Sequence, residues 1–456
     1  MSWKKEIPNL IKKVMWLLVG TQVLLGGLWF VCNLIYMPDF QETRDMLEAS
    51  KSLLVDEYMG ILYPLVIRLF SVFGEYFCVP LYILQVGVAV WSYHYLLRSI
   101  FGNRFEKSGK KYIWLMAGYL VTFPMILQCH RSILPYSLAS SLLVLLLAEV
   151  KAVMKNRPAV QRNRLIRIGI LWLLTGLLIS DYGVIATVVV VPGLVFAAWK
   201  QRKRMFVYLC ISALTLITMF TTLTLTQTPG SYGRVQRSVN SVLWTRFAWP
   251  YFERDGYYWD HKTWISFEDG EWAWASMYPE NAIYEFGPKI EQVVGKEKAK
   301  VIFGEMAKFS AQIGKKEHLK ALGRDILANA GGPFALQYQL SGRGVSYTAW
   351  NYYQMQGNIP GLTKYFVKFA IYVFEFLLLM ALCFAISRRK SRKVLGVMKK
   401  AMPALLGLGA MVLCYTMIGN GMQDYLKVVP VSLFWCMLPL LELGRLAEEP
   451  VETDEK

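Results

Sequence analysis

Cysteine and histidine are scarce in this chain, and their placement excludes two kinds of site. The seven cysteines all lie in or beside apolar stretches, and none lies in the long polar region 227–364. That region therefore has no intrachain disulfide framework. The seven cysteines and four histidines form no CxxC pair and no spacing typical of a zinc site. The sequence implies no firm cofactor and leaves a requirement for a divalent metal open.

Motifs of nucleotide-binding and soluble hydrolytic enzymes are also missing. No Walker loop, GxGxxG, HExxH or GxSxG element occurs in a supporting context. The sequence has no repeat of fixed period, and its one low-complexity tract is the acidic tail EEPVETDEK. Apolar sequence dominates instead, with 55% hydrophobic residues, 15 Trp and 26 Tyr. This composition is typical of membrane proteins with aromatic belts.

Ten apolar stretches predict an all-α polytopic membrane protein with about ten transmembrane helices. A helix of about 20 apolar residues crosses the ~30 Å hydrocarbon core. The first stretch is too long for a cleaved signal peptide and lacks its small-residue exit site, so we interpret it as a retained anchor. The two shortest stretches predict a hairpin with its tip at 180–183. The stretches are 14–36, 77–97, 112–128, 132–148, 168–180, 182–199, 205–226, 365–387, 401–419 and 428–444.

Lys and Arg are concentrated in alternate connecting segments of the formally +18 chain. The positive-inside rule then places both termini in the cytoplasm and the nearly neutral loop 227–364 outside, in the plasma membrane of a bacterial cell. Because these charges lie in short loops beside the membrane, we expect no nucleic-acid partner. The oligomeric state stays open. Of the 50 basic residues, 28 fall in 1–13, 98–111, 151–167, 200–204, 388–400 and 445–456.

The first outside loop, 37–76, is longer than a tight connection. Phe40, Leu47 and Leu54 recur every seven residues, which predicts an amphipathic helix along the membrane surface. The apolar sequence YMGILYPLVIRLFSVFG that follows contains Pro64 and Arg68. If this sequence crossed the membrane, every later segment would invert, so we expect it to lie at the outer interface.

The region 227–364 is too long for a passive connection. Its first half is rich in tryptophan, which suits either sugar stacking or a compact core. Its second half has helical periodicity. We therefore predict an N-terminal transmembrane module over 1–226 and a mostly helical, soluble extracytoplasmic domain over 227–364. A C-terminal module over 365–456 follows, with three spans and an acidic cytoplasmic tail.

Several acids lie in or beside the membrane, where a charge is costly and often functional. Asp39 directly follows the first stretch, where a carboxylate can reach both a lipid head group and a soluble acceptor. It can equally cap the next helix, with Glu42 as its capping-box partner. Asp45 is a second catalytic candidate or a solvated helix residue. Asp181 at the hairpin tip is a cap or a site residue, and Glu375 lies in mid-span as a packing residue or a functional acid.

Two groups of basic and polar residues lie at predicted outer ends of spans. His130 and Arg131 share a very short turn, where two cationic groups suit a phosphate in the outer leaflet. The alternative is an interfacial arginine that reaches to water. Asp424, Tyr425 and Lys427 begin the last span. Lys427 can contact a lipid phosphate, although Tyr and Lys are also ordinary interfacial anchors.

The order of several segments resembles the membrane glycosyltransferases of the GT-C superfamily, in particular the protein-mannosyltransferase and aminoarabinose-transferase-like group. In that group an acidic residue follows the first span, and an amphipathic helix and a Tyr-Pro element come next. The resemblance covers about 14–230 and 365–445. The segments that carry it are PDFQETRDMLEASKSLL, ILYPLVIRLFSVFG, LLRSIFG, TFPMILQCHRSILPYSLASSLLVLLL, LLTGLLISDYGVI and GNGMQDYLKVVPVSLFWCMLPLL.

This resemblance implies a polyprenyl-phosphate-linked sugar donor and an extracytoplasmic acceptor, which is a glycan, lipid or protein. Asp39 matches the catalytic acidic position in the first outside loop. His130 or Arg131 matches the turn that helps to hold the donor phosphate. Tyr63 belongs to the Tyr-Pro element and is a pocket candidate on that ground.

The sequence departs from the family pattern at two places. Asp181 falls at the Glu of the usual Leu-Thr-Arg-Pro-Glu stretch, but Ser180 stands near its Arg. Asp424 falls where a late Arg is expected, with Tyr425 retained and Lys427 three residues on. The loss of this Arg puts donor-phosphate binding in doubt unless Lys427 or the turn arginine compensates. It leaves room for a non-catalytic or strongly divergent member.

Phosphate leaves readily once its charge is neutralised, so one carboxylate and nearby cations suffice for such a transfer, without a second carboxylate as acid. We therefore expect a glycosyltransferase with Asp39 as general base. One alternative is another envelope lipid-sugar polymerase or ligase, in which Arg131 matters more than Asp39. Another is a transporter or flippase that depends on Glu375, and the last is a structural or partner-binding membrane protein.

Overall fold

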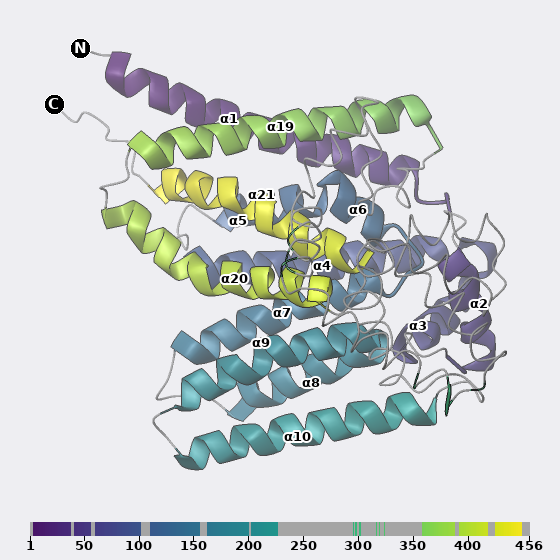
Figure 1. The fold of residues 1–456 in the computed structure, drawn as a ribbon. Coiled ribbons are helices and arrows are strands. Elements are labelled where there is room, and N and C mark those ends of the chain that lie inside the picture. Colours follow the sequence, from purple (N-terminus) through teal and green to yellow (C-terminus); the bar gives the residue numbers. More distant parts are fainter. Residues whose placement is uncertain are drawn as a thin grey trace. The chain divides into compact units, whose positions relative to one another are not determined.

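Figure 1 shows the computed structural model, a set of long helices. It describes residues 3–37, 41–55, 60–101, 110–155, 162–199, 202–226, 358–387, 392–417 and 425–448, with a few isolated residues between 295 and 323. The helices in these ranges are α1 (Trp3–Cys32), α2 (Gln41–Ser52), α3 (Leu62–Phe70), η1 (Ser71–Tyr76), α4 (Cys78–Phe101), α5 (Lys110–Val121), α6 (Pro124–His130), α7 (Tyr136–Lys155), α8 (Arg162–Leu178), α9 (Ser180–Ala198), α10 (Arg202–Leu225), α19 (Pro360–Ser387), α20 (Arg392–Met417) and α21 (Tyr425–Glu448).

The expected all-α, multi-pass membrane architecture is confirmed in the described part of the chain. Each predicted apolar stretch contains helix, but α4, α8 and α21 are not among the helices that are long and apolar enough to count as spans within the described residues. The prediction of ten spans is therefore compatible with the structure but not established. Among the described residues, six helices are long and apolar enough to cross a membrane: Leu10–Cys32, Tyr136–Met154, Ser180–Ala198, Met205–Leu225, Pro360–Phe384 and Gly396–Cys414. The bent pair Lys111–Val121 and Pro124–His130 counts as a seventh if the two helices form one broken span.

The predicted span 112–128 is not one straight helix, because the chain bends by 78° between α5 and α6. Phe123 is extended, with φ −63° and ψ 128°, and Pro124 opens the next helix. A residue that precedes proline avoids the helical region, and proline fits the first position of a helix. The break therefore follows from the Phe-Pro step. It redirects α6 and the His130–Arg131 turn at its end.

Helices α8 and α9 pack together as the predicted hairpin, but the predicted position of the tip is wrong. The break falls at Ile179, which is extended with φ −156° and ψ 129°, and residues 180–183 form the first turn of α9. Gly176 and Gly183 allow close packing here, because a Cβ on Gly183 would lie 2.9 Å from Gly176 Cα and 2.7 Å from Met219 Sδ. One extended residue, Ile179, is therefore enough to connect the two helices, because the two glycines let them approach closely.

The predicted first outside loop, 37–76, contains the expected helix, α2, but with a different buried face. Thr43, Met46 and Ala49 are buried, whereas Leu47 is half-buried and Leu54 lies beyond the helix end, 42% exposed. Phe40 lies outside the described residues. The buried positions recur at intervals of three, which is the spacing of one helix face. The seven-residue spacing therefore predicted the helix correctly but not the face that it buries.

The next helix, α3, has nine residues, which span only roughly 14 Å. This length agrees with the prediction that the segment does not cross the membrane. The chain between α2 and α3 donates hydrogen bonds to the C-terminal ends of two other helices, α8 and α10. The Val55 N–H donates to Thr226 O at 3.1 Å, just after α10, and the Gly60 N–H donates to Leu178 O at 3.2 Å, at the end of α8. These bonds satisfy carbonyl groups that a helix end leaves unpaired.

The chain divides into two compact units, and the candidate site below lies in the first. The first unit comprises 1–228, 355–410 and 428–456, and the second comprises 229–354 and 411–427. Within the first unit α7 packs against α4, α8 and α9, and 83% of its spanning window is buried. The predicted outside domain 227–364 lies almost wholly outside the described residues, and α19 begins at Pro360, before the predicted module boundary.

Candidate anion site at the end of α6

Arg131 follows α6 directly and is completely buried. Its guanidinium carbon lies 4.9 Å from the centre of the Trp29 ring and 5.1 Å from that of Tyr36. Both distances are within the range of a cation–π interaction, which is worth about 2 kcal/mol when the partners are desolvated. The end of α1 and the residues after it thus provide an aromatic wall for this cation.

Hydrogen bonds fix the orientation of the Arg131 guanidinium. Its Nε and one terminal nitrogen donate to Gln128 Oε1, at 3.3 and 2.9 Å, and its other terminal nitrogen donates to Tyr36 O at 3.3 Å. Both acceptors are neutral, an amide and a peptide carbonyl. These contacts therefore hold the guanidinium in place.

Arg131 stays cationic at neutral pH despite its burial. Burial lowers the pKa of Arg131 to about 10, an effect that electrostatic interaction with Tyr82 and Tyr36 opposes. A pKa three units above neutrality leaves about one guanidinium in a thousand deprotonated at pH 7. Arg131 therefore carries a positive charge inside the protein.

Buried polar atoms without a hydrogen-bond partner in the described part of the chain occur in residues around this cation. They include Gln128 Nε2, on the amide that holds Arg131, and the hydroxyl of Tyr82, which interacts electrostatically with Arg131. Each can donate a proton, and a buried donor left unpaired costs about 1–3 kcal/mol. A cation accompanied by unpaired donors suits an anionic oxygen ligand.

His130 was expected to contact the same phosphate, but it occupies a different environment. It is completely buried, its Nε2 lies 3.2 Å from the Tyr93 hydroxyl, and its Nδ1 lies 2.7 Å from Ser137 Oγ. Both ring nitrogens are therefore engaged within the protein, to α4 and α7. This arrangement anchors the turn and leaves Arg131 as the cation on which the site is built.

Tyr63, the predicted pocket residue, is connected to the same turn through Gln85. Its hydroxyl donates to Gln85 Oε1 at 3.1 Å, and Gln85 Nε2 donates to His130 O at 2.9 Å and Ser132 O at 3.0 Å. All these side chains are buried. The network connects α3 and α4 to the backbone on both sides of Arg131, so it fixes the position from which the guanidinium projects.

The aromatic wall is in turn held by the start of α19. Trp29 Nε1 donates to Thr363 Oγ1 at 2.9 Å, and the Trp29 ring stacks on Phe366 with centroids 5.6 Å apart. Asn33 accepts the Asn358 N–H at 2.7 Å, and the Asn358 amide donates to Cys32 O at 3.1 Å. These contacts join residues more than 320 positions apart in the sequence.

The structure describes only three of the remaining candidate residues with their side chains: Asp45, Asp181 and Glu375. Asp39 and Asp424 lie outside the described residues, and Tyr425 and Lys427 belong to the first turn of α21, with side chains that are not described. Asp45 on α2 and Asp181 in the first turn of α9 are half-buried, and Glu375 is half-buried on α19. The described residues contain no cluster of three or more His, Cys, Asp or Glu side chains that could hold a metal ion.

Sequence reasoning missed Gln85, Gln128 and Tyr82, which surround the predicted turn. One available signal was the presence of two glutamines inside otherwise apolar stretches, because a buried amide requires hydrogen-bond partners. The identity of those partners depends on which helices meet, and this information is not local. Trp29 and Tyr36 resembled ordinary belt aromatics for the same reason.

Comparison with known proteins finds only distant similarity. No family model and no curated protein matches the chain. Two solved structures are similar, both crystal structures of ArnT from Cupriavidus metallidurans, one bound to undecaprenyl phosphate and one in the apo state. The identities are 14% and 13% and the TM-scores 0.36 and 0.31, over 88% of this chain and 77% of that chain. TM-scores of this size do not establish a shared fold, so the functional assignment rests on the residues of this chain.

Proposed function

We propose that this chain is a GT-C-type membrane glycosyltransferase that moves a sugar from a polyprenyl-phosphate donor to an extracytoplasmic acceptor. The observation that carries the proposal is the buried, oriented and charged Arg131, accompanied by the unpaired donors of Gln128 and Tyr82. The turn that bears Arg131 is the one whose motif matches the donor-phosphate turn of that superfamily. The helices that are long and apolar enough to cross a membrane support the proposal, since a membrane protein has access to lipid substrates.

In the proposed reaction the acceptor hydroxyl oxygen attacks the anomeric carbon of the sugar. The bond between that carbon and the phosphate oxygen breaks, and polyprenyl phosphate leaves with the bonding electron pair. Asp39 receives the hydroxyl proton. Its reference pKa of about 3.9 makes it a carboxylate at neutral pH without special tuning. Arg131 stabilises the phosphate as its charge grows, a type of interaction that is worth several kcal/mol in a site that excludes water.

Asp45 is the second candidate for the base, since it lies on α2 in the same outside loop. The roles of Asp181, Asp424, Tyr425 and Lys427 in donor or acceptor binding remain predictions from the sequence. The topology that we propose has both termini in the cytoplasm and 227–364 outside. It follows from the distribution of Lys and Arg.

The test separates binding from chemistry. Undecaprenyl phosphate and uncharged undecaprenol are offered to the purified full chain in detergent, and the bound lipid is quantified by native mass spectrometry. We expect a preference for the phosphate that Arg131→Gln abolishes. A panel of undecaprenyl-phosphate-linked sugars is then screened for transfer, which Asp39→Asn should abolish while lipid binding persists. Equal binding of the two lipids by the wild-type chain, or full transfer by Asp39→Asn, would contradict the proposal.

A further inference from the structure

A second cluster of charged side chains joins α4, α7 and α8. Its centre is the carboxylate of Glu149 on α7, which is 3% exposed. The Tyr95 hydroxyl, on α4, donates to Glu149 Oε1 at 2.8 Å. One terminal nitrogen of Arg164 and one of Arg167, both on α8, lie 3.7 Å from the two carboxylate oxygens. A buried acid thus holds two arginines of a neighbouring helix.

This cluster is separate from the candidate site at Arg131. Ser137 in the first turn of α7 contacts His130, next to Arg131. Glu149 lies twelve residues after Ser137 on the same helix, a distance of about 18 Å along the helix axis. The cluster therefore lies toward the other end of α7, near the opposite boundary of the membrane.

The cluster has more positive than negative charge. Two guanidinium groups face one carboxylate, so two positive charges and one negative charge leave an excess of one positive charge. Each ion pair involves one nitrogen, whereas arginine has five N–H donors. The Arg164 and Arg167 side chains are 29% and 64% exposed. Glu149 therefore positions the two arginines and leaves donors at the surface for a second anion.

The position of the two arginines on α8 also favours an anion. Helix α8 begins with the sequence RNRLIR and has no acidic residue in its first turn. The start of a helix carries unpaired N–H groups and the positive end of the helix dipole, so cations are unfavourable there and anions are stabilising. The charges of Arg164 and Arg167 therefore add to that of the helix dipole.

The adjoining surface of α8 suits a lipid. Ile166 and Ile170 are 48% and 51% exposed, and residues four positions apart share one helix face. Arg167 lies three residues before Ile170, so its side chain is a neighbour of this apolar surface. A phospholipid has the same order of groups, with a charged phosphate at the membrane boundary and acyl chains deeper in the bilayer.

We propose that Arg164 and Arg167 bind the phosphate of an anionic phospholipid, with Glu149 as the residue that positions them. The exposed isoleucines favour a lipid over a soluble phosphate, because only a lipid brings acyl chains to cover them. In the topology proposed above, this lipid belongs to the cytoplasmic leaflet. The inference does not depend on the proposed function, since it concerns another end of the helices and no sugar transfer.

The test offers phosphatidylglycerol, which is anionic, and phosphatidylcholine, which is zwitterionic, to the purified full chain in detergent. Native mass spectrometry quantifies each bound lipid. We expect the wild type to prefer phosphatidylglycerol and Arg164→Gln/Arg167→Gln to lose this preference. A basic residue beside an anionic lipid contributes about a fivefold gain in affinity, so the loss of both should cost about 25-fold. Binding of phosphatidylcholine should stay the same.

Two further variants make the result specific. The double variant leaves the Glu149 carboxylate without a cation, so the triple variant that adds Glu149→Gln removes this source of instability and should also lack the preference. Arg98→Gln/Lys111→Gln is the matched control, because it removes two positive charges from exposed positions. Stacking of His94 on Trp114 places the end of α4 beside the start of α5, where these two residues lie. The control should keep the preference.

Three results would overturn the inference. The first is equal binding of the two lipids by the wild type. The second is wild-type binding of phosphatidylglycerol by the double and triple variants. The third is an equal loss in the control, which would show that net surface charge alone attracts the lipid. None of these results bears on the proposed function, because no undecaprenyl lipid takes part in the assay.

Discussion

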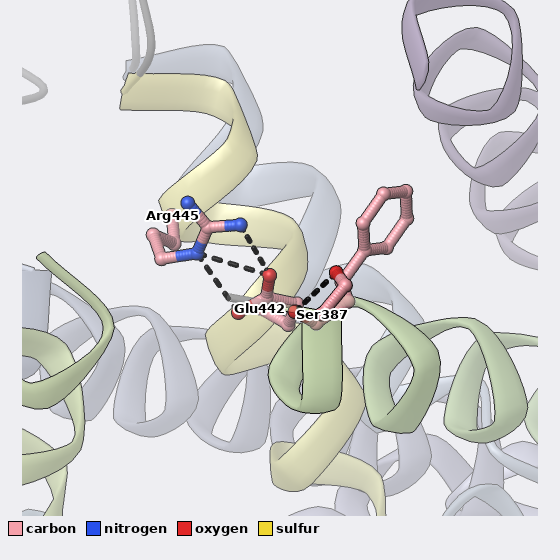
Figure 2. A network of polar contacts seen from close by, with 4 residues as sticks. Ser387, Glu442 and Arg445 are labelled. Carbon is pink, nitrogen blue, oxygen red and sulfur yellow. Dashed lines mark hydrogen bonds and ion pairs between the residues drawn. The ribbon is translucent and has the colours of Figure 1, made fainter. Parts of the chain in front are cut away.

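The buried ion pair near the end of α21 allows a quantitative prediction. Arg445 Nε donates to both carboxylate oxygens of Glu442, at 3.0 and 2.9 Å, and a terminal nitrogen of Arg445 also contacts the carboxylate (Figure 2). The two residues are 2% and 8% exposed. Between them in sequence, Gly444 packs so closely that a Cβ there would lie 2.5 Å from the Phe101 ring. The pair therefore has little room to relax or to reach water.

Glu442→Gln keeps the shape of the side chain and removes its charge. Removal of one member of a buried pair costs about 3–5 kcal/mol, because the remaining charge stays desolvated. We expect the free energy of unfolding to fall by about 3 kcal/mol, near the lower limit, since the amide oxygen still accepts one hydrogen bond. Replacement of both members by apolar residues of similar volume is often neutral. The double variant Glu442→Met/Arg445→Met should therefore be more stable than Glu442→Gln.

The assay is equilibrium unfolding in detergent, followed by tryptophan fluorescence, for the wild type, each single Met variant and the double variant. A double-mutant cycle isolates the coupling energy between the two side chains. We expect a coupling of more than 1 kcal/mol. If the two single losses simply add, the pair is not coupled and the reasoning from its burial is refuted.

Three further predictions concern other parts of the fold. Gly60→Ala should prevent stable folding, because its Cβ would lie 1.9 Å from the Leu177 backbone oxygen. Gly87→Ala on α4, where nothing lies within 4 Å of the new Cβ, should be neutral or should stabilise the protein by up to ~1 kcal/mol. Equal expression of the two variants would contradict this prediction. Undecaprenyl phosphate binding should persist from pH 7 to 9 and fall as the pH rises through about 10, the pKa of Arg131, because the free site then loses its charge; a loss complete by pH 8 would exclude Arg131 as the binding cation. Lys151→Met should lower the free energy of unfolding by about 1–2 kcal/mol, since its Nζ donates at 2.8 Å to a carbonyl in the last turn of α4; an unchanged unfolding curve would count against this contact.

Much of the fold was predictable, because apolar runs determine helices in a membrane with little help from tertiary structure. Helices lie at every predicted stretch. The errors fall where one local contact decides the outcome. The Phe123–Pro124 step breaks a continuous apolar run. The sequence alone could have predicted this helix break, because the residue before a proline avoids the helical region. The shift of the hairpin break to Ile179 depends on the packing of Gly183 against another helix, which the sequence does not reveal.

Of the candidate site, the sequence predicted the charged residue Arg131 but not its partners. Arg131 attracted attention because an ionisable residue beside the membrane is costly. Its orienting partner Gln128 lies three residues earlier, in the last turn of α6, at a spacing that allows contact. The wall formed by Trp29, however, requires α1 to meet α6, and sequence reasoning from one chain does not supply such pairings. His130 shows the opposite case, since its position suggested a ligand and its contacts make it an anchor.

The seam between α1 and α19 has a consequence for biosynthesis. Trp29 must wait for Thr363, which is made 334 residues later. At 5–20 residues per second, the ribosome needs about 15–70 s to cover that distance. During this interval the nascent chain holds an arginine whose indole neighbour has not yet received its hydrogen-bond acceptor. The hydrogen bond that holds the aromatic wall beside Arg131 can therefore form only after Thr363 has been made, well after the synthesis of α1.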